Sequence, residues 1–153
     1  DIPIGITEIG YSTFASCRSL ISIVIPSGVK NLSKTAFEFC NKLKNLNIDT
    51  DVVSKNGICG ENLTWEFDGQ GTLSISGTGN MAYYSEYPWI YVKNAINKIV
   101  IEEGVTSVEL KAFQDCINLK EIKFPESITL IGESAFEGCR ELENIIAQSA
   151  NKG

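Results

Sequence analysis

The sequence predicts a mainly β solenoid built from 23-residue repeats with short helical turns, interrupted by a β-hairpin cap segment. Three observations predict this fold. Phe, Cys and Leu recur at one spacing in each half of the chain. The residues after each Leu alternate apolar and polar, as in a half-buried strand. The middle of the chain breaks the spacing and has two alternating runs around a turn.

Four segments share the repeat, starting at Gly10, Ser33, Glu109 and Gly132. Their aligned residues are 23 apart: Phe14 and Phe37, Cys17 and Cys40, Leu20 and Leu43, then Phe113 and Phe136, Cys116 and Cys139, Leu119 and Leu142. One unit cannot bury its own apolar face. Stacking units at a strand spacing of about 4.8 Å therefore predicts columns of Phe, Cys and Leu in one core.

The middle of the chain predicts a cap. Leu63, Trp65 and Phe67 alternate, "DGQG" is a turn, and the following strand alternates again. This hairpin has an apolar face that can close the open end of a solenoid. The segment "PWIYVKNAINKIVI" then keeps the repeat register, with Ile90 at the Phe113 position, which indicates a degenerate terminal repeat.

The two arrays are out of phase, because Phe37 and Phe113 are 76 residues apart, three repeats plus 7. We therefore expect four segments. Residues 1–50 form the C-terminal part of one array and 51–59 a linker, 60–98 form the β-hairpin cap with the degenerate first repeat, and 99–153 form the second array.

Composition and charge narrow the classes of partner. The formal net charge is -6, with 19 acidic and 13 basic residues, which argues against nucleic acid or an anionic membrane as partner. No apolar run approaches the roughly 20 residues that a membrane-spanning helix needs, so no membrane insertion is expected. The chain starts without a basic and apolar leader, so any signal peptide has been removed or lies outside this chain.

The chain has no histidine. Its absence excludes Ser-His-Asp and Cys-His catalysis and most catalytic zinc sites. Carboxylate pairs such as Glu102 with Glu103 occupy variable repeat positions and are expected to be solvated. We predict no enzyme activity, no cofactor and no metal.

The cysteines Cys17, Cys40, Cys116 and Cys139 share one repeat position beside the core Phe, which favours buried free thiols. A bridge between Cys17 and Cys40 on adjacent rungs is the alternative, although the rung spacing would strain it. Cys59 lies outside the repeat, and its state stays open.

The densest aromatic cluster runs from Tyr83 to Tyr91. Clustered Tyr and Trp can stack on sugars or anchor a protein partner. The alternative is packing between cap and array, which the register of Trp89 favours and which leaves Tyr83, Tyr84 and Tyr87 on a surface loop.

The segments "AFEGCRELENI" and "AFQDCINLKEI" carry the pattern Ala-Phe-x-x-Cys-x-x-Leu-x-x-Ile. In this pattern the chain resembles the BspA-type leucine-rich repeats of secreted and surface proteins from anaerobic and gut bacteria, oral spirochaetes and some protozoan parasites. The resemblance implies a secreted or cell-surface location and adhesion to a protein of a host, a neighbouring cell or the matrix.

The function that we expect is therefore a non-catalytic interaction module that uses the exposed solenoid surface. The alternatives are carbohydrate binding through the tyrosines and a passive spacer within a larger multidomain surface protein. The candidate binding residues are Tyr83, Tyr84 and Tyr87 in the loop, and the exposed strand positions Ser22, Val24, Asn45, Asn47, Lys98, Glu121 and Lys123.

Overall fold

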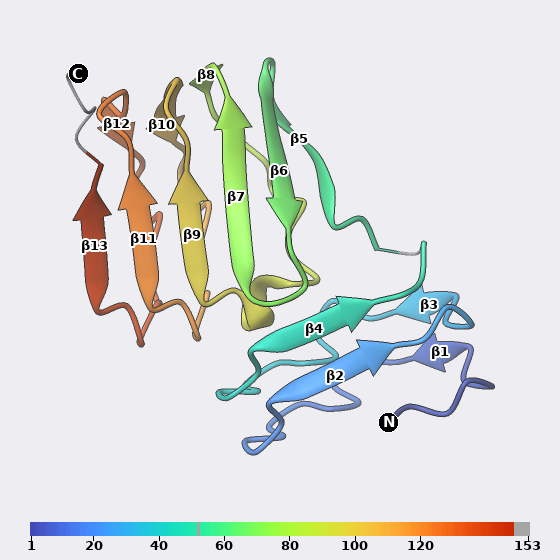
Figure 1. Ribbon diagram of the computed structural model, residues 1–153. Coiled ribbons are helices and arrows are strands. Elements are labelled where there is room, and N and C mark those ends of the chain that lie inside the picture. The colour runs from blue at the N-terminus through green and yellow to red at the C-terminus, as the bar shows by residue number, and fades with distance from the viewer. Residues whose placement is uncertain (52, 149–153) are drawn as a thin grey trace.

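The computed structural model describes residues 1–51 and 53–148 and is built almost wholly of strands and tight turns. Within those ranges there is no α-helix, and the helical element is the short 3-10 turn η1 (Lys93–Ala95). The strands form two stacks of rungs with a hairpin segment between them (Figure 1). The predicted fold class, a mainly β solenoid of 23-residue repeats with an inserted hairpin, is confirmed.

The first array has two rungs. Its strands are β1 (Glu8–Ile9), β2 (Ser22–Ile25), β3 (Asn31–Leu32) and β4 (Asn45–Ile48). β1 pairs in parallel with β3, and β2 pairs in parallel with β4. Ser22 lies opposite Asn45, so one repeat of 23 residues advances the chain by one rung.

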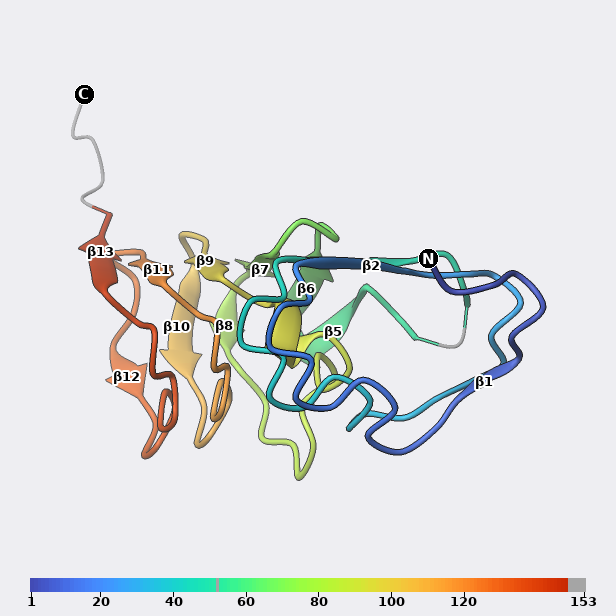
Figure 2. The same ribbon diagram turned by 90° about the horizontal axis from the view of Figure 1, so that it is seen from below.

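The second array repeats the same 23-residue spacing in sheets of its own. Its strands are β9 (Lys98–Ile101), β10 (Val105–Val108), β11 (Glu121–Phe124), β12 (Leu130–Ile131) and β13 (Asn144–Ala147). Lys98, Glu121 and Asn144 lie side by side across β9, β11 and β13. Seen from below, these three strands line one side of the stack and β8, β10 and β12 line the other (Figure 2).

The inserted segment adds strands to the second array. They are β5 (Asn56–Gly60), β6 (Leu63–Phe67), β7 (Thr72–Gly77) and β8 (Gly79–Asn80). β7 pairs in parallel with β9 and β8 with β10, whereas β6 and β5 continue the large sheet antiparallel. β7 and β8 thus occupy the place of one rung beside β9 and β10. The antiparallel strands β6 and β5 lie beyond β7 and end the parallel repeat pattern. β5 takes up residues 56–59 of the segment 51–59, which the sequence predicts as a linker.

A column of stacked aromatic rings runs through the second array. Trp89 stacks on Phe113 with ring centroids 5.1 Å apart, and Phe113 stacks on Phe136 at 5.5 Å. Trp89, and not Ile90, therefore takes the position of the core Phe, so the predicted placement of Ile90 is wrong by one residue. The degenerate repeat has one more residue between Trp89 and Ile96 than the next repeat has between Phe113 and Leu119. The short turn η1 lies in that longer stretch.

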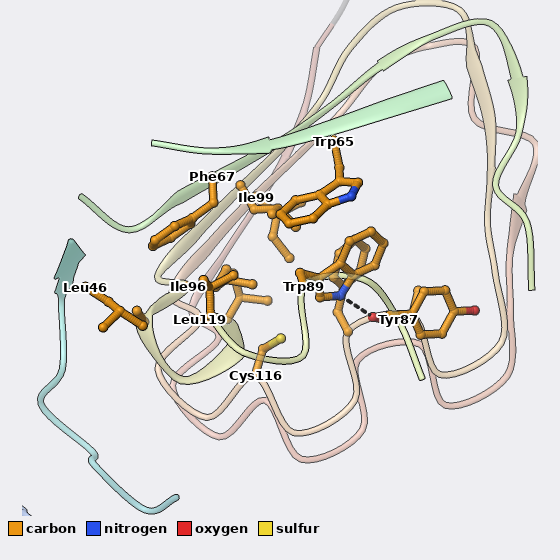
Figure 3. Close-up of a cluster of buried hydrophobic side chains, with 14 of the residues drawn as sticks. Leu46, Trp65, Phe67, Tyr87, Trp89, Ile96, Ile99, Cys116 and Leu119 are labelled. Atoms are coloured by element: carbon orange, nitrogen blue, oxygen red, sulfur yellow. Dashed lines mark hydrogen bonds between the residues drawn. The ribbon is translucent and has the colours of Figure 1, made fainter. Parts of the chain in front are cut away.

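The inserted segment also covers the end of the first array. Phe14 and Leu20 in the first rung are only partly buried, but Phe37 and Leu43 in the second rung are 2% and 0% exposed. Leu46 on β4 belongs to the same buried cluster as Phe67 and Ile96, and its side chain is directed toward theirs (Figure 3). By contrast, Ile145, the equivalent of Leu46 in the last described rung, is 68% exposed. The middle of the chain thus caps both arrays.

Candidate binding groove between the two arrays

Two buried asparagine side chains, Asn94 and Asn118, join the two arrays. The Asn118 amide, which is 5% exposed, donates hydrogen bonds to the carbonyls of Cys40 at 2.9 Å and Asn94 at 2.7 Å, with a longer contact of 3.4 Å to Leu43. Asn94 donates to the Phe37 carbonyl at 3.0 Å. A buried amide that leaves such partners loses stability. These bonds therefore hold the last rung of the first array in one orientation against the second.

Beside this junction lies an open groove of about 950 Å³. The first residues of β9, β11 and β13 line this groove, and so do the turns that lead into β2 and β4. Its volume is at the upper end of the range of roughly 300–1,000 Å³ for ligand sites. The lining residues of this basic groove are Arg18, Ile21, Asn41, Lys42, Leu43, Lys44, Asn97, Lys98, Asn118, Lys120, Glu121, Glu141 and Asn144.

The groove collects positive charge in an acidic chain. It contains five of the 13 basic residues but only two of the 19 acidic ones, which gives a net charge of +3 where the rest of the chain carries -9. A concave surface of one sign concentrates field lines and attracts ligands of the opposite sign. The groove is thus positively charged within a chain whose net charge is negative.

One pair in the groove is already neutralised. Lys98 Nζ lies 2.9 Å from a Glu121 carboxylate oxygen, and this hydrogen bond raises the pKa of Lys98 and lowers the pKa of Glu121. Both side chains are about one third exposed, so the pair contributes little to stability. The groove's other basic side chains, Arg18, Lys42, Lys44 and Lys120, are exposed and face a single further carboxylate, that of Glu141.

A second, smaller hollow of about 250 Å³ adjoins the basic groove, because Asn41 and Glu141 line both. Phe39 stands in this hollow with 61% of its surface exposed. Its backbone is left-handed, with φ of 58°, at the repeat position where Gly138 has φ of 76°. Ser16 and Asp115 have the same left-handed backbone at this repeat position, so the repeat turn requires it, and a bulky residue such as Phe39 costs on the order of 1 kcal/mol there. We call this site the Phe39 hollow.

The predicted strand positions form two ladders. On β2 and β4, Ser22 lies beside Asn45 and Val24 beside Asn47, and all four are exposed. On β9 and β11, Lys98, Glu121 and Lys123 are partly buried. The structure brings Lys98 and Glu121 into the basic groove, whereas the β2 and β4 positions and Lys123 lie outside it.

The tyrosine loop offers less surface than expected. Tyr83 is 63% exposed, but Tyr84 is half-buried and donates to the Ile58 carbonyl at 3.3 Å. Tyr87 is 8% exposed, and its hydroxyl donates to the Leu110 carbonyl at 2.8 Å. Burial is the main cause that raises the pKa of Tyr87 to about 12. The expected surface position is wrong for Tyr87, which packs against Trp89 as the first ring of the aromatic column.

The repeat cysteines serve packing between rungs. Cys40 and Cys116 are buried and Cys139 is partly buried, so the prediction of buried thiols is confirmed for Cys40 and Cys116. The Cys40 thiol donates to the carbonyl of Phe14 in the preceding rung at 3.1 Å, and Cys139 repeats this contact to Phe113 at 3.2 Å. Cys17 is exposed, contrary to the prediction, because no preceding rung packs on it in the described chain.

All five thiols are free in the structure, and Cys59 is buried within the cap. Burial raises the pKa of Cys59 to about 12 and the pKa of Cys139 to about 11. These thiols are thus protonated near neutral pH and poor nucleophiles.

In the described part of the chain, no group of three or more His, Cys, Asp or Glu side chains could hold a metal ion. Over residues 1–51 and 53–148, no helix is long and apolar enough to cross a membrane.

The stacked 23-residue rungs and the inward Leu and Ile columns define a leucine-rich repeat solenoid. Six copies of the BspA type leucine-rich repeat match residues 1–60 and 88–152, and the chain belongs to this family. The unmatched residues 61–87 hold most of the hairpin cap and the tyrosine loop. Among curated protein sequences, none matches this chain.

One solved structure supports the fold, and two further ones have lower TM-scores. A leucine-rich repeat protein from Eubacterium ventriosum superposes with a TM-score of 0.57 at 25% identity, over 61% of this chain and 26% of its own. A leucine-rich cell surface protein from Faecalibacterium prausnitzii has 24% identity and a TM-score of 0.38, over 95% of this chain and 40% of its own. A Bacteroides ovatus leucine-rich repeat protein has 29% identity and a TM-score of 0.36, over 92% of this chain and 29% of its own. The chain thus spans less than half the length of each.

Proposed function

We propose that the chain is a non-catalytic protein-interaction module of a secreted or cell-surface protein. The basic groove is the observation that carries the proposal. Nearly all repeat residues are explained as core or corners, yet five basic side chains gather at the one place where two arrays converge. The groove and the exposed β2 and β4 ladder together offer a rigid surface, which lowers the entropic cost of binding.

Location and partner rest on the family. BspA-type repeats are characteristic of secreted and surface proteins, which supports adhesion to a protein of a host, a neighbouring cell or the matrix as the use of this surface. Within such a protein, we propose that residues 1–50 and 99–153 are the repeat arrays, with the linker 51–59 and the cap with its degenerate repeat, 60–98, between them.

The test captures partners on the immobilised chain. Extracellular-matrix and cell-surface protein fractions are passed over the wild type, and retained proteins are identified and titrated. One variant places charge on the ladder (Val24→Arg with Asn47→Arg), and another reverses charge in the groove (Lys42→Glu with Lys44→Glu). Ser27→Arg with Ser54→Arg is the control for the ladder variant, because both serines are exposed and lie outside these surfaces.

We expect a saturable partner that at least one surface variant loses and the control keeps. If no protein is retained, or if every variant retains it equally, the module acts as a passive spacer within a larger protein instead.

Carbohydrate binding is the second candidate, and the exposed ring of Tyr83 beside a hollow of about 290 Å³ favours it. A single exposed ring gives one stacking contact, so the affinity should be weak. A glycan array on which Tyr83→Ala with Tyr84→Ala abolishes binding would support this candidate, and an array without signal would remove it.

A further inference from the structure

We propose that the basic groove binds an extended acidic peptide segment of a protein partner, with its carboxylates against the groove's lysine and arginine side chains and an apolar side chain against Phe39. This inference rests on the proposed function, because it names the part of the partner that the surface recognises.

The exposed basic side chains of the groove are complementary in charge to the carboxylates of an acidic peptide. Arg18, the pair Lys42 and Lys44, and Lys120 come from three different turns, and all four side chains are exposed at the same groove. Lys44 and Lys120 occupy the same repeat position, directly after a buried Leu, in different arrays. The junction asparagine Asn118 fixes the two arrays against each other, so this arrangement is present before a ligand binds.

The shape of the site suits a linear ligand. The basic groove continues past Asn41 and Glu141 into the Phe39 hollow, so a linear ligand can occupy both. In an extended peptide, side chains on one face recur about every 7 Å. Alternate residues of one segment can thus meet the basic side chains and then Phe39, whose ring is exposed.

The mixed charge along the basic groove and the Phe39 hollow favours a peptide over a uniform polyanion. The path is not positive throughout, because Glu141 lies at its middle and the Phe39 hollow adds Glu38 and Asp115. A nucleic acid or a sulfated glycan carries charge at every unit and meets repulsion there. A peptide places its carboxylates selectively, and its amide groups can bond to Asn41 and Asn144, both exposed in the groove.

The test selects peptides on the folded 153-residue chain. A phage-displayed library of random dodecapeptides is panned against the wild type at about 0.15 M salt, and the enriched peptides are synthesised and titrated by fluorescence anisotropy. Lys42→Glu with Lys44→Glu reverses the groove charge. Its matched control is Lys30→Glu with Lys111→Glu, because these lysines are exposed and outside the groove. Phe39→Asn tests the ring, with the 79% exposed Tyr11→Asn as its control.

We expect enrichment of peptides with several Asp or Glu residues and one apolar residue. Groove reversal should weaken their binding about tenfold or more, because two attractive contacts become repulsive, and the control should change it less than about twofold. Phe39→Asn should weaken binding about fivefold or more and Tyr11→Asn should not. Circular dichroism of each variant shows that the loss is not unfolding.

Peptides without acidic bias, no enrichment at all, or acidic peptides that the reversed groove still binds equally would overturn the inference. So would a heparin fragment or a single-stranded oligonucleotide that binds the groove more tightly than every selected peptide. The proposed function fails separately, when no matrix or surface protein is retained. A retained partner that the reversed groove still binds contradicts only the peptide site.

Discussion

Replacing Asn118 by Ala should weaken the contact between the two arrays and lower the free energy of unfolding. Asn118 is buried and its amide reaches the carbonyls of Cys40 and Asn94 at 2.9 and 2.7 Å. Ala is compatible with the local backbone, because Ala95 occupies the same position in the preceding repeat and is fully buried. The substitution therefore removes the Asn118 bonds to Cys40 and Leu43 in the first array without disturbing the rung itself, whereas the Asn94 bond to the first array remains.

The expected loss follows from the contacts. Two good hydrogen bonds and one long one are removed, each worth on the order of 1 kcal/mol net, which would give about 2–3 kcal/mol. The Cys40 carbonyl keeps its bond from the Leu43 amide at 3.1 Å, so the lower figure, about 2 kcal/mol, is expected. For a chain of this size the same change lowers the melting temperature by about 4–8 °C.

Urea denaturation followed by circular dichroism measures this loss, with Glu141→Ala as control. Glu141 occupies the repeat position of Asn118 one rung further on but is exposed, so its removal should change the free energy of unfolding by less than about 0.5 kcal/mol. If Asn118→Ala costs no more than Glu141→Ala, the amide does not hold the arrays together, and the fixed geometry of the basic groove loses its physical basis.

Three further predictions concern the hydrogen bonding of two tryptophans, the reactivity of the thiols and the left-handed backbone at Phe39. Trp65 Nε1 is buried without a hydrogen-bond partner among the described residues, whereas Trp89 Nε1 donates to the Ala112 carbonyl at 2.9 Å. Trp65→Phe should therefore destabilise less than Trp89→Phe, by about 1 kcal/mol in thermal melts, and equal losses would contradict this ranking. In the native protein at pH 8 a maleimide should label Cys17 first, because burial raises the pKa values of Cys40, Cys59, Cys116 and Cys139 and thus lowers their thiolate fraction, and all five should react after denaturation; mass spectrometry that finds Cys59 labelled as fast as Cys17 would refute it. Phe39→Asn should leave stability unchanged or raise it by up to about 1 kcal/mol, since Asn tolerates the left-handed backbone better, and a clear loss in urea melts would show that the ring packs more than its exposure indicates.

The repeat register was predictable because it is local. Each strand pairs with the one 23 residues away, so periodicity alone places Glu121 between Lys98 and Asn144, as found. The hairpin with alternating Leu63, Trp65 and Phe67 was readable for the same reason.

Three features were not predictable from periodicity. The shift from Ile90 to Trp89 depends on how one additional residue is absorbed near η1. The second role of the cap, covering Leu46, and the reach of Asn118 to Cys40 join segments with no shared spacing. Such contacts depend on the angle between the two arrays, which nothing local in the sequence specifies.

Only part of the candidate site could be predicted from the sequence. Lys98 and Glu121 were predicted as exposed strand positions, and both line the groove. Lys42, Lys44 and Lys120 lie in turns, where charged residues are ordinary and give no signal singly. The one available signal was that Lys44 and Lys120 share a repeat position across the two arrays. Phe39 could have been noticed as an aromatic residue aligned with Gly138 at a tight turn.

The position of the cap in the chain has a consequence for biosynthesis. The surface of β4 that carries Leu46 is covered by residues that follow it, and Asn118 is translated about 70 residues after Ile48. At ~5–20 residues per second the first array waits on the order of 4–14 s for the Asn118 contacts that complete its junction. During that interval an apolar rung with an open strand edge is exposed on the ribosome. Chaperone binding or delayed compaction of the first array is therefore expected until the second array has emerged.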